Sequence, residues 1–301
     1  MIYLLLIIPI YFILCYIIFL FVCKVNKNTT FRVIDDNIEV LLKPYKELMD
    51  YGTSWVKKQN IEDLYIKSVD GLKLHGIFIK NPNEKGIFIL SHGYRSNKER
   101  DLFSALHEDY KLGLSLLILD SRCCGESEGK YITFGYYESK DINLWVNYVS
   151  KKFKPKKILI GGVSLGAASS LLVNNKKVSA ILSDSPFESG YKEIKYCISH
   201  YFHLPGFIFM PGINLWCKLC AHFDLKKTDA HENLKKISVP ILWVHGLDDD
   251  FVIPKNSINL YDSYEHKKDL FLVSGANHGM GYLLEPENYF IKVKSFLKNI
   301  L

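Results

Sequence analysis

The chain has 301 residues, of which 48% are hydrophobic and 23% are charged, and its formal net charge at pH 7 is +6. This composition excludes a disordered or fibrous protein and leaves room for one sizeable α/β domain with a short additional segment. The positive charge comes from lysine pairs scattered along the chain, so no nucleic-acid-binding module is indicated. These pairs are expected to be solvated surface, with a weak attraction to anionic lipid as the alternative.

The start of the chain is a long apolar segment. Residues 2–23 contain no charged side chain and are long enough, as a helix, to cross a hydrocarbon core of about 30 Å. A cleaved signal peptide is disfavoured, because no basic residue precedes the segment and no small-residue cleavage site follows it. A buried core helix fits less well, because the segment is apolar on every side. We therefore predict a single transmembrane anchor over residues 1–23.

The basic residues that follow this segment predict its orientation. Lys24, Lys27 and Arg32 all come after the apolar run, so the positive-inside rule places the rest of the chain in the cytoplasm. The seven cysteines are odd in number and irregularly spaced, which favours a reducing compartment over a disulfide framework. Residues 24–60 are interpreted as a linker and a juxtamembrane helix, without an assigned function.

From residue 61 onward, strands and helices alternate along the chain. A hairpin is predicted first, with strands at 61–69 and 72–80 joined by the turn residues Asp70 and Gly71. Further buried strands are predicted at residues 86–91, 114–120, 158–161, 178–183, 240–244 and 269–273. Helical patterns separate most of them. This alternation predicts a doubly wound, mostly parallel sheet of about eight strands over residues 61–301.

One segment interrupts the alternation. Residues 187–236 are rich in aromatic and apolar side chains, and they predict a short helical cap over the site. The segment also contains residue types that bind zinc, namely His200, His203, Cys217, Cys220 and His222. The cysteines lie in an apolar, helix-like run, so a buried face of the cap explains them without a metal. No metal site is therefore predicted.

The most informative motif is the pentapeptide Gly-Val-Ser-Leu-Gly at residues 162–166. It follows a strongly apolar strand and precedes small, helix-compatible residues, as in the G-x-S-x-G turn that lifts a serine above a sheet. The serine at such a tip adopts a strained backbone, and Gly162 and Gly166 stand where a Cβ would collide with the strand and the helix. Ser164 is the predicted nucleophile, with an ordinary glycine-rich turn as the alternative.

A serine hydroxyl is a poor nucleophile at neutral pH, so it needs a histidine base and an acid that orients the histidine. The last two predicted strands are each followed by a loop with a suitable residue, and both loops would lie at the carboxyl edge of the sheet. Of the ten histidines, His278 alone stands in a glycine-flanked loop after the last strand. His92 and His245 precede glycines at strand ends and are expected to hold loop backbone. Spacing alone does not choose the acid among the aspartates at 248–250.

Acyl transfer also needs N–H donors for the oxyanion of the tetrahedral intermediate. The predicted donors are the backbone N–H groups of Leu165, directly after the serine, and of Tyr94, in the loop after strand 86–91. Because only backbone atoms are used, the side chains at these two positions carry little information.

Five segments occur in a fixed order, namely SHGY at 91–94, DSRCCGESEG at 120–129, GVSLG at 162–166, HGLDDDFV at 245–252 and GANHG at 275–279. Together they resemble the α/β-hydrolase-fold serine hydrolases, in particular membrane-tethered members of the lipase, acyl-esterase and serine-aminopeptidase-like group. The resemblance runs from about residue 61 to the C-terminus. It implies that the acid is the fifth residue of H-G-x-x-D, which is Asp249. Cys123 stands where this group has a glycine, so no subfamily is named.

The resemblance implies a serine hydrolase that cleaves carboxyl esters or thioesters through an acyl-enzyme, with Ser164 as nucleophile, His278 as base and Asp249 as acid. No cofactor is implied. A serine aminopeptidase or an acyltransferase could use the same residues, and a non-catalytic, membrane-tethered module that binds lipid or a partner is the alternative from another class. The apolar cap favours acyl chains of medium or greater length, since each buried CH₂ contributes about 0.8 kcal/mol.

Overall fold

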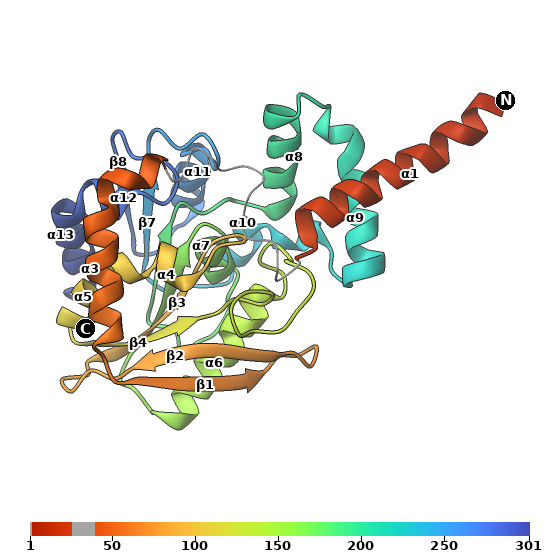
Figure 1. Ribbon diagram of the computed structural model, residues 1–301. Helices are drawn as coiled ribbons and strands as arrows, with labels where there is room; N and C mark the ends of the chain where they lie inside the picture. The colour runs from red at the N-terminus through yellow and green to blue at the C-terminus, as the bar shows by residue number, and fades with distance from the viewer. Residues whose placement is uncertain (1, 26–39) are drawn as a thin grey trace.

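Figure 1 shows the computed structural model, in which residues 2–25 and 40–301 are described. Its centre is an eight-stranded sheet with the strand order β1-β2-β4-β3-β5-β6-β7-β8. The strands are β1 (Ile61–Lys67), β2 (Lys73–Ile79), β3 (Gly86–Ser91), β4 (Leu114–Leu119), β5 (Ile158–Val163), β6 (Ala180–Asp184), β7 (Ile241–Gly246) and β8 (Lys268–Val273). Strand β2 is antiparallel to β1 and β4, and the other neighbours pair in parallel. The predicted mostly parallel sheet of about eight strands is confirmed.

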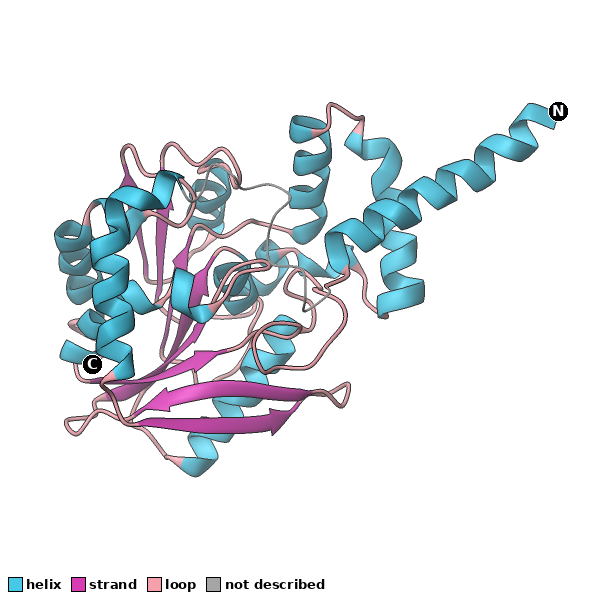
Figure 2. Ribbon diagram, in the orientation of Figure 1, coloured by secondary structure: helices cyan, strands magenta, loops and turns pink. Residues whose placement is uncertain are grey.

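Helices cover both faces of the sheet (Figure 2). One face carries α3 (Lys46–Lys57), α5 (Phe103–Lys111) and α13 (Pro286–Leu297), and the other carries α6 (Glu138–Lys152), α7 (Leu165–Leu171), α10 (Ala230–Leu234) and α11 (Lys255–Ser263). Shorter elements are η1 (Lys43–Tyr45), α4 (Lys98–Asp101) and α12 (Gly281–Leu284). Because helices shield both faces, inner strands such as β3 and β4 are buried at every position and read as continuous apolar runs.

The strand order determines which loops meet. Strands β3, β5, β7 and β8 run in the same direction and end at the same edge of the sheet. The loops that follow them contain the residues singled out above, at 92–94, 164–165, 248–250 and 278. Segments that are far apart in the sequence are thereby gathered at the carboxyl edge of the sheet, where open α/β sheets bind their ligands.

The first hairpin differs from its predicted form. Lys67 at the end of β1 pairs with Lys73 at the start of β2, so residues 68–72 form the connection, not Asp70 and Gly71 alone. The N–H of Ser68 donates to the carbonyl oxygen of Leu72 at 2.9 Å, and Gly71 takes a left-handed φ of 90°. The hydroxyl of Ser68 also donates to Oδ1 of Asp70 at 2.6 Å. This local side-chain bond stabilises a longer turn than the dipeptide signal indicates.

The segment before the sheet is described in part. Residues 26–39 of the predicted linker, with Lys27 and Arg32, lie outside the described residues. Helix α3 packs on α5, since Val56 is buried and a Cβ at Gly52 would meet the backbone of Phe103. The predicted juxtamembrane helix is therefore one of the helices that cover the sheet.

The predicted cap interval, residues 187–236, contains α8 (Gly190–Tyr201), α9 (Gly206–Ala221), η2 (Leu225–Thr228) and α10. Helices α8 and α9 form a third apolar core together with α1 (Ile2–Cys23). Ile198, Met210 and Ile213 are buried in this core. Much of the apolar content of the cap is thus used to hold α1.

Helix α1 packs along the cap through one of its faces (Figure 1). Cys15, Phe19 and Cys23 are fully buried. Trp216 of α9 donates from Nε1 to the carbonyl oxygen of Phe12 at 2.9 Å. These contacts make α1 a part of the folded protein.

The prediction of a transmembrane anchor over residues 1–23 is not supported. In the part of the chain that the structure describes, no helix is both long enough and apolar enough to cross a membrane. The cap accounts for part of the apolar run, because it covers the face of α1 that carries Cys15, Phe19 and Cys23. The predicted cytoplasmic position of the domain depended on this anchor and stays a prediction.

We expect Phe19→Ala to lower the free energy of unfolding by about 3 kcal/mol, because the ring is fully buried against Tyr131 and its removal leaves a cavity. Ile17, on the same helix, is 54% exposed, so Ile17→Ala should change this free energy by less than about 0.5 kcal/mol. Urea unfolding followed by tryptophan fluorescence measures both variants. Equally small effects would contradict the packing of α1 on the cap.

Candidate active site

Ser164 stands at the turn between β5 and α7 in a strained backbone conformation. Its φ of 55° and ψ of −116° lie outside the regions that residues with a side chain favour. A Cβ at Gly162 or at Gly166 would overlap the carbonyl oxygen of Ser91, the last residue of β3. Glycine at both positions therefore lets β3, β5 and α7 approach closely enough to hold the serine in this turn.

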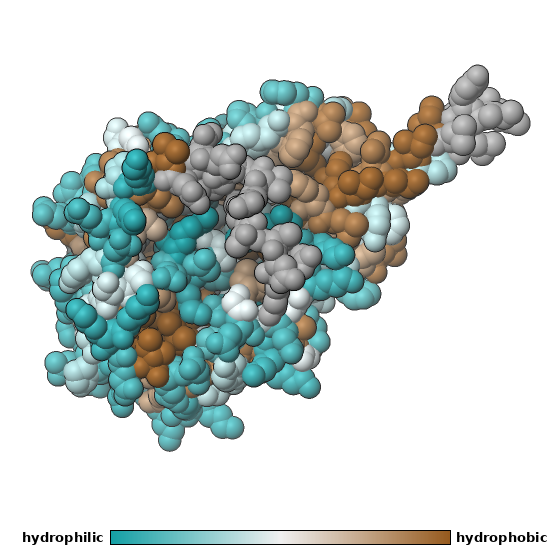
Figure 3. Space-filling model, in the orientation of Figure 1, coloured by the Kyte–Doolittle hydropathy of each residue, from teal (hydrophilic) through white to brown (hydrophobic). Residues whose placement is uncertain are grey.

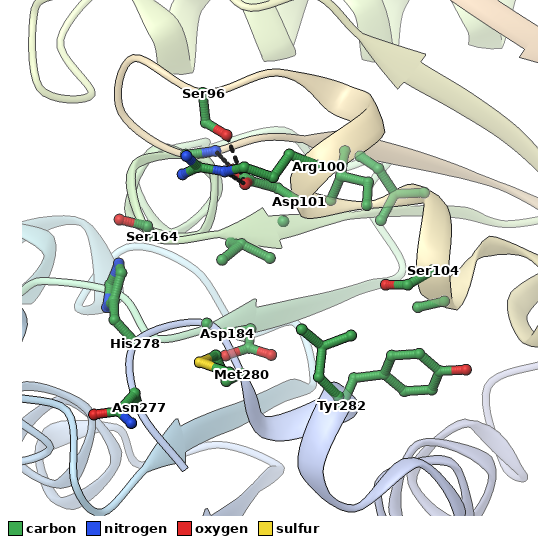
Figure 4. A pocket seen from close by; sticks show the side chains of 18 of the residues that line it. Ser96, Arg100, Asp101, Ser104, Ser164, Asp184, Asn277, His278, Met280 and Tyr282 are labelled. Carbon is green, nitrogen blue, oxygen red and sulfur yellow. Dashed lines mark hydrogen bonds and ion pairs between the residues drawn. The ribbon is translucent and has the colours of Figure 1, made fainter. Parts of the chain in front are cut away.

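His278 and Asp249 meet next to this turn. Nδ1 of His278 lies 2.6 Å from Oδ2 of Asp249, whose side chain is fully buried, while the histidine side chain is 22% exposed. With the carboxylate ionised, Nδ1–H donates to it, which leaves Nε2 to accept a proton. Nε2 has no hydrogen-bond partner among the described residues, and Figure 4 shows the ring beside Ser164 at a cavity. The structure thus brings together the three residues that the sequence singled out.

The structure also distinguishes the three aspartates of this loop. Asp249 is buried, whereas Asp248 and Asp250 are exposed. Oδ1 of Asp249 accepts hydrogen bonds from the backbone N–H groups of residues 251 and 252, at 3.1 and 2.9 Å, so the loop folds around this carboxylate. Its second oxygen contacts His278. Burial and hydrogen bonding both favour Asp249 as the acid.

His245 contacts Asp249 in a way that the sequence did not reveal. As expected, it holds loop backbone, since its Nε2 lies 2.7 Å from the carbonyl oxygen of Val252. The same atom also lies 3.1 Å from Oδ2 of Asp249, and Nδ1 lies 2.6 Å from the hydroxyl of Ser257. The ring is fully buried and helps to fix the carboxylate that His278 contacts. One sign of this role was present in the sequence, because His245 precedes a glycine at the end of a predicted strand.

Charges within the site shift the pKa values of both partners. Burial alone would raise the pKa of Asp249, but the charge on His278 and hydrogen bonds from His245 and His278 lower that pKa to about 2. Burial pulls the pKa of His278 down, yet the Asp249 carboxylate, with help from Glu193 and Asp184, raises this pKa above its ordinary value. Asp249 therefore stays ionised at neutral pH and stabilises the protonated form of His278.

Helix α8 of the cap also reaches the site, which the sequence did not predict. The hydroxyls of Tyr196 and Tyr201 both donate to the carbonyl oxygen of Asp250, at 3.0 and 3.1 Å, and connect α8 to the loop that contains Asp249. Glu193 of the same helix is buried, and burial raises its pKa to about 7. Sγ of Cys197 donates to Oε1 of Glu193 at 3.5 Å. These residues belong to no motif, because only the folded cap brings them near His278.

The two predicted oxyanion donors belong to backbone segments that lie next to Ser164. Leu165 is the first residue of α7 and follows the serine directly. The loop that contains Tyr94 runs against the serine, since a Cβ at Gly93 would lie 3.3 Å from the Cβ of Ser164. The N–H of Gly93 donates to Oδ2 of Asp101 at 2.8 Å and fixes this loop. Both backbone segments are thus next to the serine, as an oxyanion hole requires.

The end of α1 holds the same loop. The hydroxyl of Tyr94 donates to the carbonyl oxygen of Val22 at 2.6 Å. The guanidinium of Arg95, a residue with a left-handed φ of 48°, donates to the carbonyl oxygens of Phe21 and Lys24. The bonds to Phe21 and Val22 satisfy carbonyl groups in the last turn of α1 that lack partners within the helix, and Lys24 follows directly after that turn. Helix α1 and the predicted oxyanion loop are therefore directly connected.

A cavity of about 390 Å³ opens beside Ser164 and His278 (Figure 4). It extends under α5 and α13, between side chains that are mostly apolar, including Phe88, Leu90, Leu102, Leu106, Leu182 and Val293. Asp109 also lines it, and burial raises the pKa of this carboxyl to about 8, so it is largely neutral at pH 7. The volume lies in the range of small-molecule sites. The cavity can therefore receive an apolar group attached to a carbonyl beside Ser164.

The residues weighed as a zinc site do not come together. Cys217 is buried, with its Sγ 4.0 Å from the Sγ of Cys23, whereas His200, His203 and His222 are exposed. Among the described side chains, no group of three or more His, Cys, Asp or Glu residues is placed to hold a metal ion. The packing of α9 on α1 accounts for Cys217.

Comparisons with known proteins extend these observations. No protein-family model matches the chain. The uncharacterized protein YqkD of Bacillus subtilis is 27% identical over 240 residues, which cover 78% of each chain. The human alpha/beta hydrolase domain-containing protein 17B is 22% identical over 257 residues, which cover 81% of this chain and 80% of that one. The solved structure of the Pyrococcus furiosus esterase Pf2001 matches with a TM-score of 0.68 and 22% identity, covering 92% of this chain and 98% of its own.

The chain has the α/β-hydrolase fold. In α/β-hydrolases that act through a triad, the residues follow in the chain order serine, acid, histidine, with the serine on a sharp strand-to-helix turn. Ser164 after β5, Asp249 after β7 and His278 after β8 occur in that order. The α/β-hydrolase fold therefore explains why these three loops lie at one edge of the sheet.

We expect the imidazole of His278 to titrate above about 6.5, the ordinary pKa of histidine, because the Asp249 carboxylate outweighs burial. Asp249→Asn should move this pKa below that value, since burial then dominates. Asp248→Asn removes an exposed neighbouring charge and should leave the titration almost unchanged. Two-dimensional NMR of the imidazole rings measures all three, with His278→Gln assigning the signal.

The same shifts determine how the pair contributes to stability. Because the pKa of His278 is raised in the folded state, its contribution is present below about pH 6.5 and is lost as the pH rises through the folded-state pKa. The lowered pKa of Asp249 has the opposite sign, with a contribution present above about pH 4 and lost as the pH falls toward about 2. The pairing of Asp249 with His278 would be contradicted if the unfolding free energy depended on pH in the same way in Asp249→Asn as in the unaltered protein.

Proposed function

We propose that this protein is a serine hydrolase that cleaves carboxyl esters or thioesters of apolar acyl groups through an acyl-enzyme. One observation carries the proposal. The Asp249–His278 hydrogen bond of 2.6 Å lies beside a serine in a strained turn, at the mouth of an apolar cavity. An ordinary glycine-rich turn would need none of these neighbours. The name of the matched Pyrococcus furiosus protein, an esterase, supports the same class of reaction.

In the proposed mechanism, Nε2 of His278 removes the proton of the Ser164 hydroxyl as Oγ attacks the acyl carbonyl carbon. Asp249 keeps the ring in the tautomer with a proton on Nδ1 and stabilises the imidazolium that forms. The N–H groups of Leu165 and Tyr94 receive the negative charge on the carbonyl oxygen, which is the largest single contribution in many acyl-transfer enzymes. His278 then protonates the leaving alkoxide or thiolate, and the acyl group stays on Oγ.

Water completes the cycle by the same steps in reverse. His278 takes a proton from the water molecule as it attacks the acyl-enzyme, and returns that proton to Ser164 Oγ when the acid product leaves. No step in this sequence needs a cofactor. An acyl acceptor other than water would make the protein an acyltransferase on the same residues, and an aminoacyl amide substrate would make it an aminopeptidase.

The proposed substrate class follows from the cavity. The apolar side chains around it come mainly from the sheet, α5 and α13, and of the described cap residues only Tyr201 lines it. Filling it with an alkyl chain removes apolar surface from water, at about 0.8 kcal/mol for each CH₂ that becomes buried. We therefore expect acyl chains of medium or greater length to be preferred over acetyl esters.

The first test is covalent labelling. A fluorophosphonate probe should react with the purified chain at Ser164, located by mass spectrometry, and Ser164→Ala should abolish the adduct. Among the three loop aspartates, Asp249→Asn should slow ester turnover by about ten-thousandfold, because the base loses its orienting acid. Asp248→Asn and Asp250→Asn are matched controls on exposed residues and should change turnover by less than about threefold.

Two results would contradict the proposed function. A folded protein that takes no label, or that labels equally in Ser164→Ala, would favour a non-catalytic binding module. A loss of turnover in Asp248→Asn or Asp250→Asn as large as in Asp249→Asn would show that a different aspartate orients the base.

The second test concerns chain length. Ala105 lines the cavity, and Ala105→Phe should reduce its volume without altering the residues of the proposed triad. We expect kcat/KM to rise with chain length in a p-nitrophenyl ester series, and to fall about tenfold or more for long chains in Ala105→Phe while acetyl esters are little changed. A maximum at the acetyl ester in the unaltered protein would contradict the apolar acyl site. Activity confined to aminoacyl amides in the same assay would indicate an aminopeptidase.

A further inference from the structure

Helix α1 and the α8–α9 corner of the cap present large apolar side chains on one side of the molecule. Ile10, Ile13 and Ile17 are exposed on α1, and Phe202, Phe207 and Leu219 are exposed on the cap. The rings of Phe21 and Phe202 lie 6.3 Å apart, so the two sets adjoin. Figure 3 shows this apolar surface over α1 and α9, in contrast to the hydrophilic surface over much of the rest of the view. We call these six residues and Phe21 the apolar face.

The apolar face is too large to be explained as scattered surface residues. Phe207 is 66% exposed and Ile13 is 57% exposed, and α1 points away from the sheet, where the described parts of the chain do not cover it (Figure 1). Contiguous exposed apolar patches of this kind mark contacts with a partner or with lipid. Burial of a side chain of this size stabilises by an amount that corresponds to about tenfold or more in a binding constant.

The charges around the apolar face indicate what covers it. Neither residues 2–34 nor residues 194–223 contain an aspartate or a glutamate, although the chain has 32 of them. Lys24 at the end of α1 is exposed. Lys195 of α8 is also exposed, and it lies beside the start of α9, since its side chain contacts the position of a Cβ at Gly206. A second copy would bring these like charges together, whereas anionic headgroups would pair with them.

We propose that the apolar face binds the surface of a bilayer that contains anionic phospholipid. The outer sides of α1 and of the α8–α9 corner lie at the boundary between headgroups and acyl chains, and Lys24 and Lys195 lie at the headgroups. The protein rests on one leaflet in this arrangement. The inference does not depend on the proposed hydrolase activity, because it uses no residue of the triad.

Lipid binding at this face would also orient the cavity. Tyr201 lines the cavity, and the next residue, Phe202, belongs to the apolar face. Tyr94, at the same cavity, is bonded to Val22 near the end of α1. The mouth of the cavity therefore lies next to the proposed lipid surface, and an apolar acyl group could pass from the bilayer without crossing bulk water.

Vesicle sedimentation of the full-length chain tests the proposal, after dilution of any detergent below its micelle concentration. Vesicles of phosphatidylcholine with about one third phosphatidylglycerol should bind the protein at least about fivefold more tightly than pure phosphatidylcholine, and Lys195→Gln should reduce this difference. Added salt should weaken binding to the anionic vesicles. Phe207→Ser and Ile13→Ser should each lower the partition coefficient by about tenfold.

Ile291 provides a matched control. It is 66% exposed, like Phe207, but it lies on α13, which is on the other side of the molecule from α1 and α9 (Figure 1). Ile291→Ser should leave vesicle binding unchanged. Equal losses in Ile291→Ser and Phe207→Ser, or no sedimentation with either kind of vesicle, would overturn the proposal. A lipid-free dimer that Phe207→Ser dissociates, with no vesicle binding, would overturn it in favour of a second copy.

Ester hydrolysis measured on the same samples keeps this inference separate from the proposed function. Phe207→Ser should bind vesicles about tenfold more weakly while it hydrolyses a water-soluble ester at an unchanged rate, which supports the lipid-binding role of the face. Vesicle binding by a protein without any hydrolytic activity would support the lipid surface and overturn the hydrolase. Hydrolysis by a protein that binds no vesicles would support the hydrolase and overturn the lipid surface.

Discussion

The carboxyl edge of the sheet depends on one close approach, between the carbonyl oxygen of Ser91 and the two glycines that flank Ser164. Since any Cβ at Gly162 or Gly166 would overlap that oxygen, β3, β5 and α7 can meet only where these side chains are absent. The approach forces Ser164 to a φ of 55°, a strain on the order of 1–3 kcal/mol. The buried core on both faces of β5 offsets this strain, and the N–H of Ser164 donates to the carbonyl oxygen of Asp184 at 2.8 Å. The hydroxyl is thereby held at the sheet edge where the other loops arrive.

A buried carboxylate imposes the second constraint. Removing the charge of Asp249 from water would cost several kcal/mol without partners. Its two oxygens are therefore surrounded by the N–H groups of residues 251 and 252 and by the rings of His245 and His278. Of the two histidine rings, only that of His278 lines the cavity beside Ser164. The other groups keep the carboxylate ionised and fixed, so that the orientation of His278 follows from the packing of the loop around Asp249.

The sequence allowed the sheet, the strained turn and the loop of His278 to be predicted, because each has a local pattern of apolar runs and glycines. The choice of Asp249 needed a resemblance, since the burial that separates it from Asp248 and Asp250 arises only in the fold. The contact of His245 with the acid and the approach of Glu193 could not be predicted for the same reason. The prediction of an anchor over residues 1–23 was not supported. An apolar sequence shows that a segment avoids water, but it does not show whether lipid or the rest of the protein covers it. Cys123, noted as a departure from glycine, has a φ of 70°, so the left-handed backbone that favours glycine is kept at that position.

Helix α1 links the apolar face to the candidate site. On its outer side it carries exposed isoleucines, and at its C-terminal end the carbonyl oxygens of Val22 and Lys24 accept hydrogen bonds from Tyr94 and Arg95. Each such bond contributes about 0.5–1.5 kcal/mol, and Arg95 sits in a left-handed conformation that relaxes unless its contacts hold it. A shift of α1 that broke both bonds would therefore change the population of the ordered loop by about tenfold. The N–H of Tyr94 is the proposed oxyanion donor. The position of α1 therefore affects where this donor lies relative to Ser164.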